Sequence, residues 1–93
     1  MIVNWAVDAL RLLAYLRDMI TQDLDATGLL CPLPVLKLRK RLSALSPGDR
    51  IRLSADDPAA VIDVPHFCAE AGHLLVETQE IGAVQIYVVE KRG

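Results

Sequence analysis

Between residues 22 and 55, two short segments alternate between hydrophobic and polar residues, and a segment of helical periodicity separates them. Residues Gln22 to Ala26 and Arg50 to Ala55 alternate with a period of two, which predicts two strands. Between them, Pro32 to Leu45 has the apolar spacing of a helix, which should end at the turn-forming residues Ser46 to Asp49. The order up to this point is strand, helix, strand.

A second helix is predicted after the second strand. Asp57 followed by Pro58 is typical of a helix start, because the aspartate can cap the helix and proline suits its first turn. We expect this helix to run to about Ala71 and to end at Gly72. Pro65 lies inside it and should kink the helix or split it in two.

Two further strands, His73 to Glu80 and Ala83 to Glu90, are predicted with a tight turn through Ile81 and Gly82. The full order is β-α-β-α-β-β. It predicts an α/β (α+β) fold, a two-layer sandwich with a mixed four-stranded sheet and both helices on one face. The other face should be polar, since we expect it to carry Arg52, Ser54, Glu77, Gln79 and Gln85.

Residues 1–20 form a separate N-terminal extension before the domain of residues 21–93. Their apolar run is interrupted by Asp8 and Arg11 and has neither a basic start nor a cleavage site, which argues against a spanning helix and a signal peptide. An amphipathic helix fits better. Its wide apolar side could support self-association, dock on a partner or membrane surface, or lie outside a native product that starts at Met19.

Composition and charge narrow the function classes. The chain has 93 residues, of which 53% are hydrophobic, enough for one small domain with its own core. A net charge of -2 gives no general reason to expect nucleic acid or a membrane as partner. The two cysteines, Cys31 and Cys68, fit neither a disulfide framework nor a zinc site, so we expect a reduced cytoplasmic protein with no metal and no cofactor.

Cys31 is the strongest candidate for chemistry. If Pro32 is the first helical residue, Cys31 is the N-cap, and prolines at positions 32 and 34 remove only N–H groups that lack helical partners. The N–H of Leu33 could then point at the sulfur, and the positive helix end would favour a thiolate. Cys31 should therefore be a nucleophile able to carry an anionic outer sulfur.

The cysteine loop and Cys68 are expected to differ in how far they are buried. Leu29 and Leu30 are expected to anchor the loop on the core and leave the sulfur at the surface. A lone cysteine is more often a small buried apolar residue, but a position at a helix N-cap followed by proline favours the reactive role for Cys31. Core packing is our interpretation of Cys68, which follows Phe67 inside the second helix. A resolving role for Cys68 is the minority hypothesis.

Basic residues cluster on the first helix, where they form either a solvated face or a docking surface for an acidic partner or a tRNA-modifying complex. They are Lys37, Arg39, Lys40 and Arg41. His66 and His73 could be imagined as an acid–base pair, but scattered histidines are more often structural or exposed.

Two separated motifs resemble one family. Residues Leu24 to Pro34, LDATGLLCPLP, resemble the opening signature of the TusA-like (SirA, YedF, YeeD) sulfur carriers. Further on, Asp57-Pro58, Asp63-Val64-Pro65, Phe67-Cys68 and Gly72-His73 resemble that family's second segment in order and spacing. The resemblance covers roughly residues 21–90 and implies the same small α/β sandwich.

The resemblance implies a sulfurtransferase-like relay. Cys31 would accept a sulfane sulfur as a persulfide from a donor protein, such as a cysteine desulfurase or rhodanese, and pass it to an acceptor protein. Asp25 would bond nearby backbone and shape the loop, and Thr27 replaces the family's common arginine. The resemblance also implies that five residues of the motif support Cys31 in this role: Asp25, Gly28, Pro32, Leu33 and Pro34.

The pathway served stays open between tRNA thiolation, molybdenum cofactor assembly, oxidation of reduced sulfur compounds and selenium handling. The alternative function is a non-catalytic regulatory module that binds protein or nucleic acid and in which the cysteine is incidental.

Overall fold

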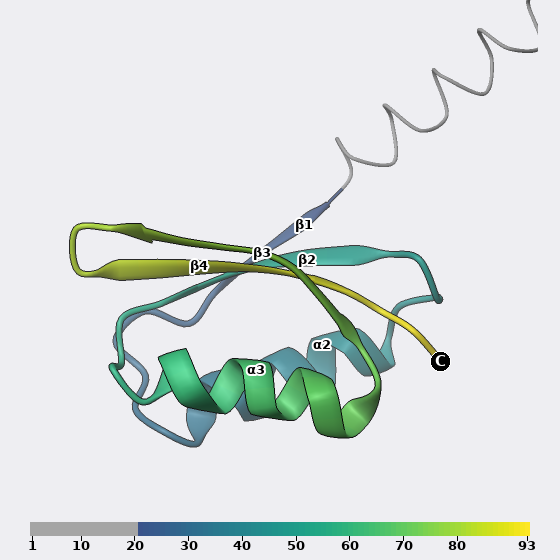
Figure 1. The fold of residues 1–93 in the computed structure, drawn as a ribbon, viewed down its shortest axis with the longest axis horizontal. Coiled ribbons are helices and arrows are strands. Elements are labelled where there is room, and N and C mark those ends of the chain that lie inside the picture. The colour runs from purple at the N-terminus through teal and green to yellow at the C-terminus, as the bar shows by residue number, and fades with distance from the viewer. Residues whose placement is uncertain (1–20) are drawn as a thin grey trace, which may run out of the picture.

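Four strands and two helices follow one another in the computed structural model, which describes residues 21–93 (Figure 1). In chain order they are β1 (Gln22–Asp25), α2 (Leu33–Ser43), β2 (Arg50–Ala55), α3 (Ala60–Ala71), β3 (Leu74–Ile81) and β4 (Val84–Glu90). The predicted order is confirmed. The helix expected over residues 1–20 and the hypotheses attached to it, including a start at Met19, lie outside the described residues.

The sheet is mixed, as predicted, and its strand order is β1-β2-β4-β3. β1 runs parallel to β2, with Leu24 opposite Leu53, while β4 is antiparallel to both of its neighbours, β2 and β3. Both helices cover the same face of this sheet (Figure 1). A two-layer sandwich results, in which each helix buries one side against the strands.

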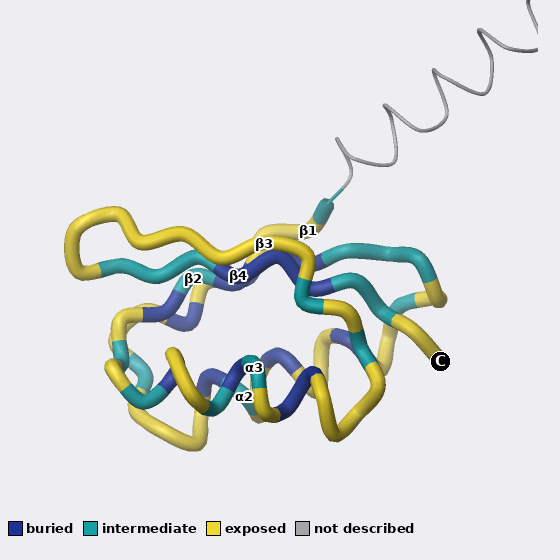
Figure 2. Tube along the Cα trace, viewed as in Figure 1, coloured by how far each residue is buried: buried dark blue, intermediate teal, exposed yellow. Residues whose placement is uncertain are grey.

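The core lies between the helices and the sheet, where the buried segments of Figure 2 face one another. In β2 the alternate residues Ile51, Leu53 and Ala55 are fully buried. Helices α2 and α3 contribute residues at helical spacing. The buried side chains they supply are Leu38, Leu42, Ala60, Val64, Phe67 and Cys68.

The opposite face of the sheet is less polar than the sequence predicted. Gln85 pairs with Ala55, a buried core residue, so it lies on the helix-covered face and its assignment to the open face is wrong. Ile86 and Val88 instead pair with Ser54 and Arg52 on the open face. Side chains of β4 do alternate between the two faces, but both faces of this strand are mainly apolar. The sequence therefore does not indicate which face of β4 the helices cover.

Helix α3 starts later than predicted and is not split. Oδ1 of Asp57 accepts the N–H of Ala59 at 3.2 Å, and the carbonyl of Asp57 accepts the N–H of Ala60 at 3.0 Å, so a turn precedes the helix. Pro65 lies inside one continuous helix. Val64 and Phe67, on either side of the proline, are both buried in the core and hold the two halves in line.

The β3–β4 hairpin differs from the prediction by one residue. Ile81 pairs with Val84, so the turn consists of Gly82 and Ala83, and Gly82 has a φ of 61°. Near the start of β3 the register shifts between Leu75 and Glu77. Val76 is thus an extra residue in the edge strand, as in a β-bulge.

Within residues 21–93, neither helix is long and apolar enough to cross a membrane.

Candidate functional site

The loop that carries Cys31 joins β1 to α2, and it lies at the same end of the sandwich as the loop that leads into α3 (Figure 1). Cys31 is exposed and unpaired with the other cysteine. Because both helices begin at this end, Asp57 and Asp63 come within hydrogen-bond distance of the cysteine although they are far from it in sequence.

Helix α2 begins one residue later than predicted. Pro32 is the N-cap and Leu33 the first helical residue, so Cys31 lies just before the cap. The reason is a turn ahead of the helix, in which the N–H of Leu33 donates to the carbonyl of Leu30 at 2.8 Å. The expectation that this N–H points at the sulfur is therefore wrong. Pro34 is buried in the first turn, whereas Pro32 is exposed.

Two carboxylates from the loop before α3 hold the backbone around Cys31. Oδ1 of Asp56 accepts the N–H of Gly28 at 2.9 Å, and Oδ2 of Asp57 accepts the N–H of Cys31 at 2.6 Å. Gly28 has a φ of 80°, a conformation that glycine adopts without steric cost. The reactive loop is thus fastened at both ends to another part of the chain.

Asp25 shapes the start of the same loop. Its Oδ1 accepts hydrogen bonds from the N–H and the hydroxyl of Thr27, at 2.9 and 2.6 Å. These bonds, that of the hydroxyl first, lower the pKa of Asp25 below its usual value. The ammonium of Lys37 donates to the carbonyl of Asp25 at 2.5 Å, which ties α2 to the end of β1.

The thiol of Cys31 donates a hydrogen bond to Oδ2 of Asp63 at 2.7 Å. This bond raises the pKa of the Cys31 thiol above its ordinary value, desolvation adds to the shift, and so do the negative charges of Asp63 and Asp57. The expected preference for a thiolate is therefore wrong for the unloaded protein. A carboxylate in contact with the sulfur outweighs the partial charge of the helix end.

A hollow of about 200 Å³ opens beside Cys31 between the two helices. Cys31 and Asp63 lie at one side of it, and Arg39, His66 and Glu70 also line it. His66 pairs with Glu70 at 3.2 Å across one turn of α3. The space is large enough for an outer sulfur atom on Cys31 and for the end of a partner's side chain.

Exposed apolar side chains lie close to Cys31 and Asp63 in the sequence. Leu29 packs against the core as expected, but Leu30 is 70% exposed, so the prediction that Leu30 anchors the loop is wrong. Leu33 and Ile62 are exposed as well. Cys31 is thus reachable from outside and bordered by side chains that would gain from burial.

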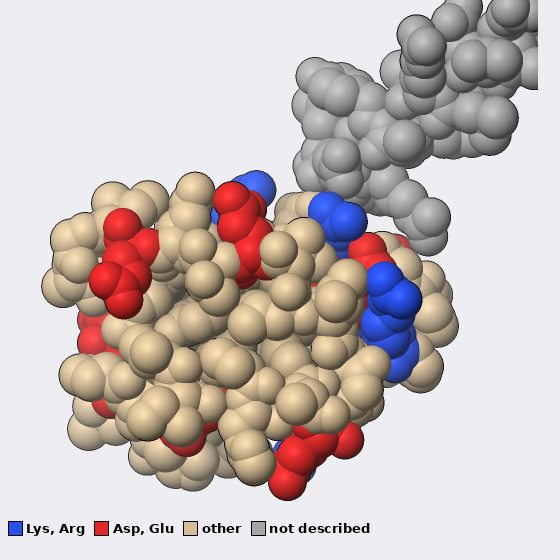
Figure 3. Space-filling model, viewed as in Figure 1, with Lys and Arg blue, Asp and Glu red and all other residues tan. Residues whose placement is uncertain are grey.

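Three basic residues of α2, Lys37, Lys40 and Arg41, line one hollow of about 340 Å³, whereas Arg39 lies apart from them. Lys37 and Arg41 reach toward β1, where Arg41 donates to Oε1 of Gln22 at 3.5 Å. The guanidinium carbon of Arg39 lies 5.3 Å from the centre of the Phe67 ring on α3, and Lys40 is exposed. On the face that Figure 3 presents, acidic and basic side chains are scattered in several separate places. Docking through this cluster stays a prediction.

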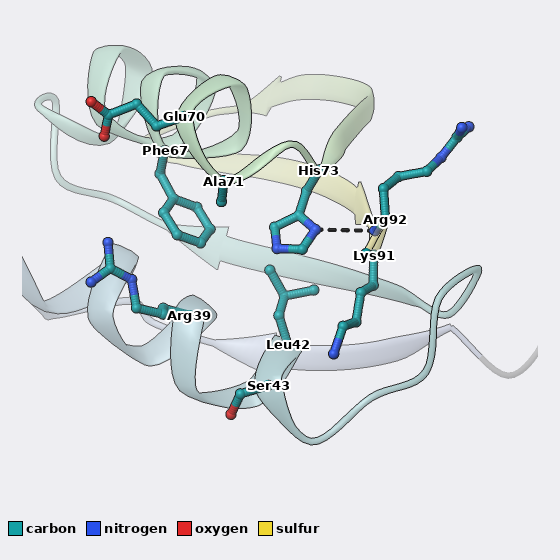
Figure 4. Close-up of a pocket in the computed structure, with 10 residues that line it drawn as sticks. Arg39, Leu42, Ser43, Phe67, Glu70, Ala71, His73, Lys91 and Arg92 are labelled. Atoms are coloured by element: carbon teal, nitrogen blue, oxygen red, sulfur yellow. Dashed lines mark hydrogen bonds between the residues drawn. The ribbon is translucent and has the colours of Figure 1, made fainter.

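A second hollow, of about 470 Å³, lies between the later turns of the helices and the C-terminal residues (Figure 4). His73 lines it, and its Nδ1 accepts the N–H of Arg92 at 3.0 Å. Burial and the charge of Lys91 lower the pKa of His73. Since His66 lines the other hollow, the two histidines do not form an acid–base pair.

Cys68 lies in the core, as predicted, with 2% of its surface exposed. Burial raises the pKa of its thiol to about 11. Among residues 21–93, no group of three histidine, cysteine or acidic side chains is arranged to hold a metal ion.

Sequence reasoning found Cys31 but missed the carboxylates of Asp56, Asp57 and Asp63 as parts of its surroundings. Asp57 and Asp63 do belong to the second motif quoted above. The available signal was the position of these two motif residues at the start of the helix that follows β2. That helix, α3, begins at the same end of the fold as α2, so its first residues lie near Cys31.

The chain is similar to known proteins in sequence and in fold. The family model described as "Sulfurtransferase TusA" matches residues 22–91. Proteins named "Sulfur carrier protein TusA" from Pseudomonas paraeruginosa and Pseudomonas aeruginosa are each 44% identical over 70 residues, covering 75% of this chain and 89% of theirs. A SirA-like protein from Desulfitobacterium hafniense has a similar fold, with a TM-score of 0.68 at 21% identity over 75% of this chain and 96% of its own.

Proposed function

Because this chain belongs to the TusA sulfurtransferase family, we propose that it is a sulfur carrier whose Cys31 holds a sulfane sulfur as a persulfide. The sulfur comes from a donor protein of the cysteine desulfurase or rhodanese type and goes on to an acceptor protein. This relay takes place in a reducing compartment, the cytoplasm, where both cysteines remain free.

The transfer is an exchange at sulfur. The Cys31 thiolate attacks the outer sulfur of the donor persulfide, a new S–S bond forms at Cys31, and the donor thiolate leaves. An acceptor thiolate later attacks the outer sulfur on Cys31 and releases the Cys31 thiolate. No cofactor enters either step.

The observation that carries the proposal is the position of Cys31 Sγ. The side chain is exposed, stands at the edge of a hollow of about 200 Å³, and belongs to a loop held by hydrogen bonds from its backbone to Asp56 and Asp57. A fixed, accessible sulfur with free space beside it suits transfer between two proteins better than a role in packing.

Exposed apolar side chains favour protein partners. Leu30, 70% exposed, directly precedes the cysteine, and Ile62, 74% exposed, precedes Asp63. Such side chains stabilise a complex when a partner covers them. The acidic and apolar surroundings of Cys31 are therefore the proposed docking surface, together with the predicted basic residues of α2.

Intact-mass measurement tests the carrier role. After incubation with polysulfide, or with a cysteine desulfurase and cysteine, the protein should gain one sulfur atom, about 32 Da, that dithiothreitol removes. Cys31→Ser should gain none and Cys68→Ala should gain it normally. Sulfur retained by Cys31→Ser would contradict the proposal.

A matched pair of variants tests the docking surface. Leu30→Ser should slow loading by the desulfurase and leave loading by polysulfide unchanged, because only the first requires a protein complex. Ile81→Ser removes a similarly exposed side chain, 60% exposed, in the distant β3–β4 hairpin and should change neither rate.

A further inference from the structure

Asp63 lies in the first turn of α3 with its carboxylate against the sulfur of Cys31. The positive end of a helix attracts negative charge to its first turn, which is where this carboxylate lies. Among residues 21–93 no basic group forms an ion pair with Asp63. No ion pair among the described residues therefore holds this carboxylate, although Arg39 lines the same hollow.

The same carboxylate acts in opposite directions on the two states of the carrier. In the unloaded state Cys31 is a thiol, whose hydrogen Asp63 accepts at 2.7 Å. In the loaded state the outer sulfur is largely anionic at neutral pH, since a persulfide is a stronger acid than the corresponding thiol. The anion has no hydrogen to donate, and two negative charges then face each other.

We propose that Asp63 is a positioning residue that sets how tightly Cys31 retains its sulfur, by stabilising the unloaded thiol relative to the loaded persulfide. The inference rests on the proposed function and adds to it the direction in which Asp63 shifts the sulfur-transfer equilibrium. Asp63 makes the carrier release sulfur more readily than a cysteine without this neighbour.

The exchange is balanced without a further reactant. In Cys31–SH + R–S–SH ⇌ Cys31–S–SH + R–SH, one S–S bond breaks in the donor and one forms at Cys31. The electron pair leaves with the donor sulfur, which takes up the proton that Cys31 loses. The donor's inner sulfur is reduced to a thiol as the sulfur of Cys31 is oxidised.

Other charged groups face the same sulfur and modify the effect without reversing it. Asp57, from the loop before α3, adds a second negative charge. On α3, His66 and Glu70 pair with each other, and Arg39 on α2 lies over the Phe67 ring. Asp57 accepts the backbone N–H of Cys31, a group that is the same in the unloaded and loaded proteins. Asp63 accepts the thiol hydrogen, so of these two carboxylates it is Asp63 that loses a hydrogen bond on loading.

An equilibrium measurement tests the inference on the full chain. Wild type, Asp63→Asn, Asp63→Glu and Asp23→Asn are equilibrated anaerobically with fixed ratios of glutathione persulfide and glutathione, and the loaded fraction of Cys31 is read by mass. Asp63→Asn should raise the ratio of loaded to unloaded protein about two- to fivefold near pH 8, the size expected for an exposed charge interaction. The increase should shrink near pH 5, as the persulfide becomes protonated.

The other variants separate charge from structure. Asp63→Glu keeps the charge and should stay close to wild type. Asp23→Asn removes an exposed carboxylate on β1 that pairs with Arg52, and it should leave the equilibrium unchanged. If Asp63→Asn does not fold, wild type still decides, because its loading relative to glutathione should fall as the pH rises through the range in which persulfides ionise while both thiols stay protonated.

The outcomes distinguish this inference from the proposed function. Wild type that loads on Cys31, with Asp63→Asn loading equally at every pH, overturns the role of Asp63 and leaves the carrier function intact. Wild type that never loads on Cys31 overturns the carrier function and the inference with it.

Discussion

The backbone N–H of Cys31 donates a hydrogen bond to Oδ2 of Asp57 at 2.6 Å, while Oδ1 of the same side chain accepts the N–H of Ala59 at 3.2 Å. One carboxylate therefore joins the loop before α2 to the turn that leads into α3. The position of the reactive sulfur depends on a residue that is 26 positions away in the sequence.

Replacement of Asp57 by alanine should destabilise the protein. The variant loses an acceptor for two backbone N–H groups, and the loss of such a capping interaction typically costs about 1 kcal/mol. Urea unfolding measures the change. Asp23→Ala, which removes only an exposed ion pair with Arg52, should change the free energy of unfolding by less than about 0.5 kcal/mol. Equal stability of the two variants would contradict the structural role of Asp57.

The rate at which Cys31 is alkylated should show the influence of Asp63 on its pKa. Since the hydrogen bond to Asp63 raises the pKa of the thiol, the reactive thiolate forms at higher pH than in an unperturbed cysteine. The pH profile of the reaction with iodoacetamide should therefore have a midpoint above that of glutathione. Asp63→Asn should move the midpoint to lower pH, and a midpoint that does not move would rule out this assignment of the shift.

The two cysteines should differ sharply in reactivity. Burial raises the pKa of Cys68 to about 11 and covers its sulfur, whereas Cys31 is exposed. Iodoacetamide near pH 8 should therefore add one label per native chain, at residue 31, and two labels after denaturation in urea. Peptide mass mapping locates the labels, and rapid native labelling of Cys68 would show that the core opens there.

Gly28→Ala should cost stability for conformational reasons alone. Gly28 has a φ of 80°, and an added Cβ would meet no atom within 4 Å, so the cost is that of a left-handed backbone, about 1–2 kcal/mol. Thermal unfolding measures it. Gly93→Ala, at the end of the chain and also with a positive φ, is the matched control and should leave the melting temperature unchanged. A Gly28→Ala protein as stable as wild type would contradict the described loop conformation.

The sequence predicted the elements well where hydrophobic periodicity specifies them. β2 alternates between buried and less buried residues along its length, and its predicted bounds match the structure. The ends of the helices were less predictable, because they depend on hydrogen bonds within the preceding turns. The bond from Leu33 N–H to the Leu30 carbonyl moved the start of α2, and the turn from Asp57 to Ala60 delayed α3.

The candidate site was predictable only in part. Cys31 is conspicuous because of the prolines beside it, but the bonds from Cys31 to Asp57 and Asp63 span 26 and 32 residues. No local pattern reports such contacts. These contacts also explain why the pKa of the Cys31 thiol is raised although a lowered pKa was expected. The expectation considered only the positive end of α2, whereas α3 supplies the negative charge of Asp63.

The extra residue Val76 in β3 has a consequence for how copies of this protein meet. β3 is an outer strand of eight residues, and Leu74, Val76 and Ile81 are exposed along it, so its free backbone edge could add to a sheet in a neighbouring molecule. The bulge interrupts that edge, and Glu77 and Glu80 place like charges along it. The other edge, β1, has only four residues. Neither border of the sheet is thus a good template for the open-ended strand addition that leads to aggregation.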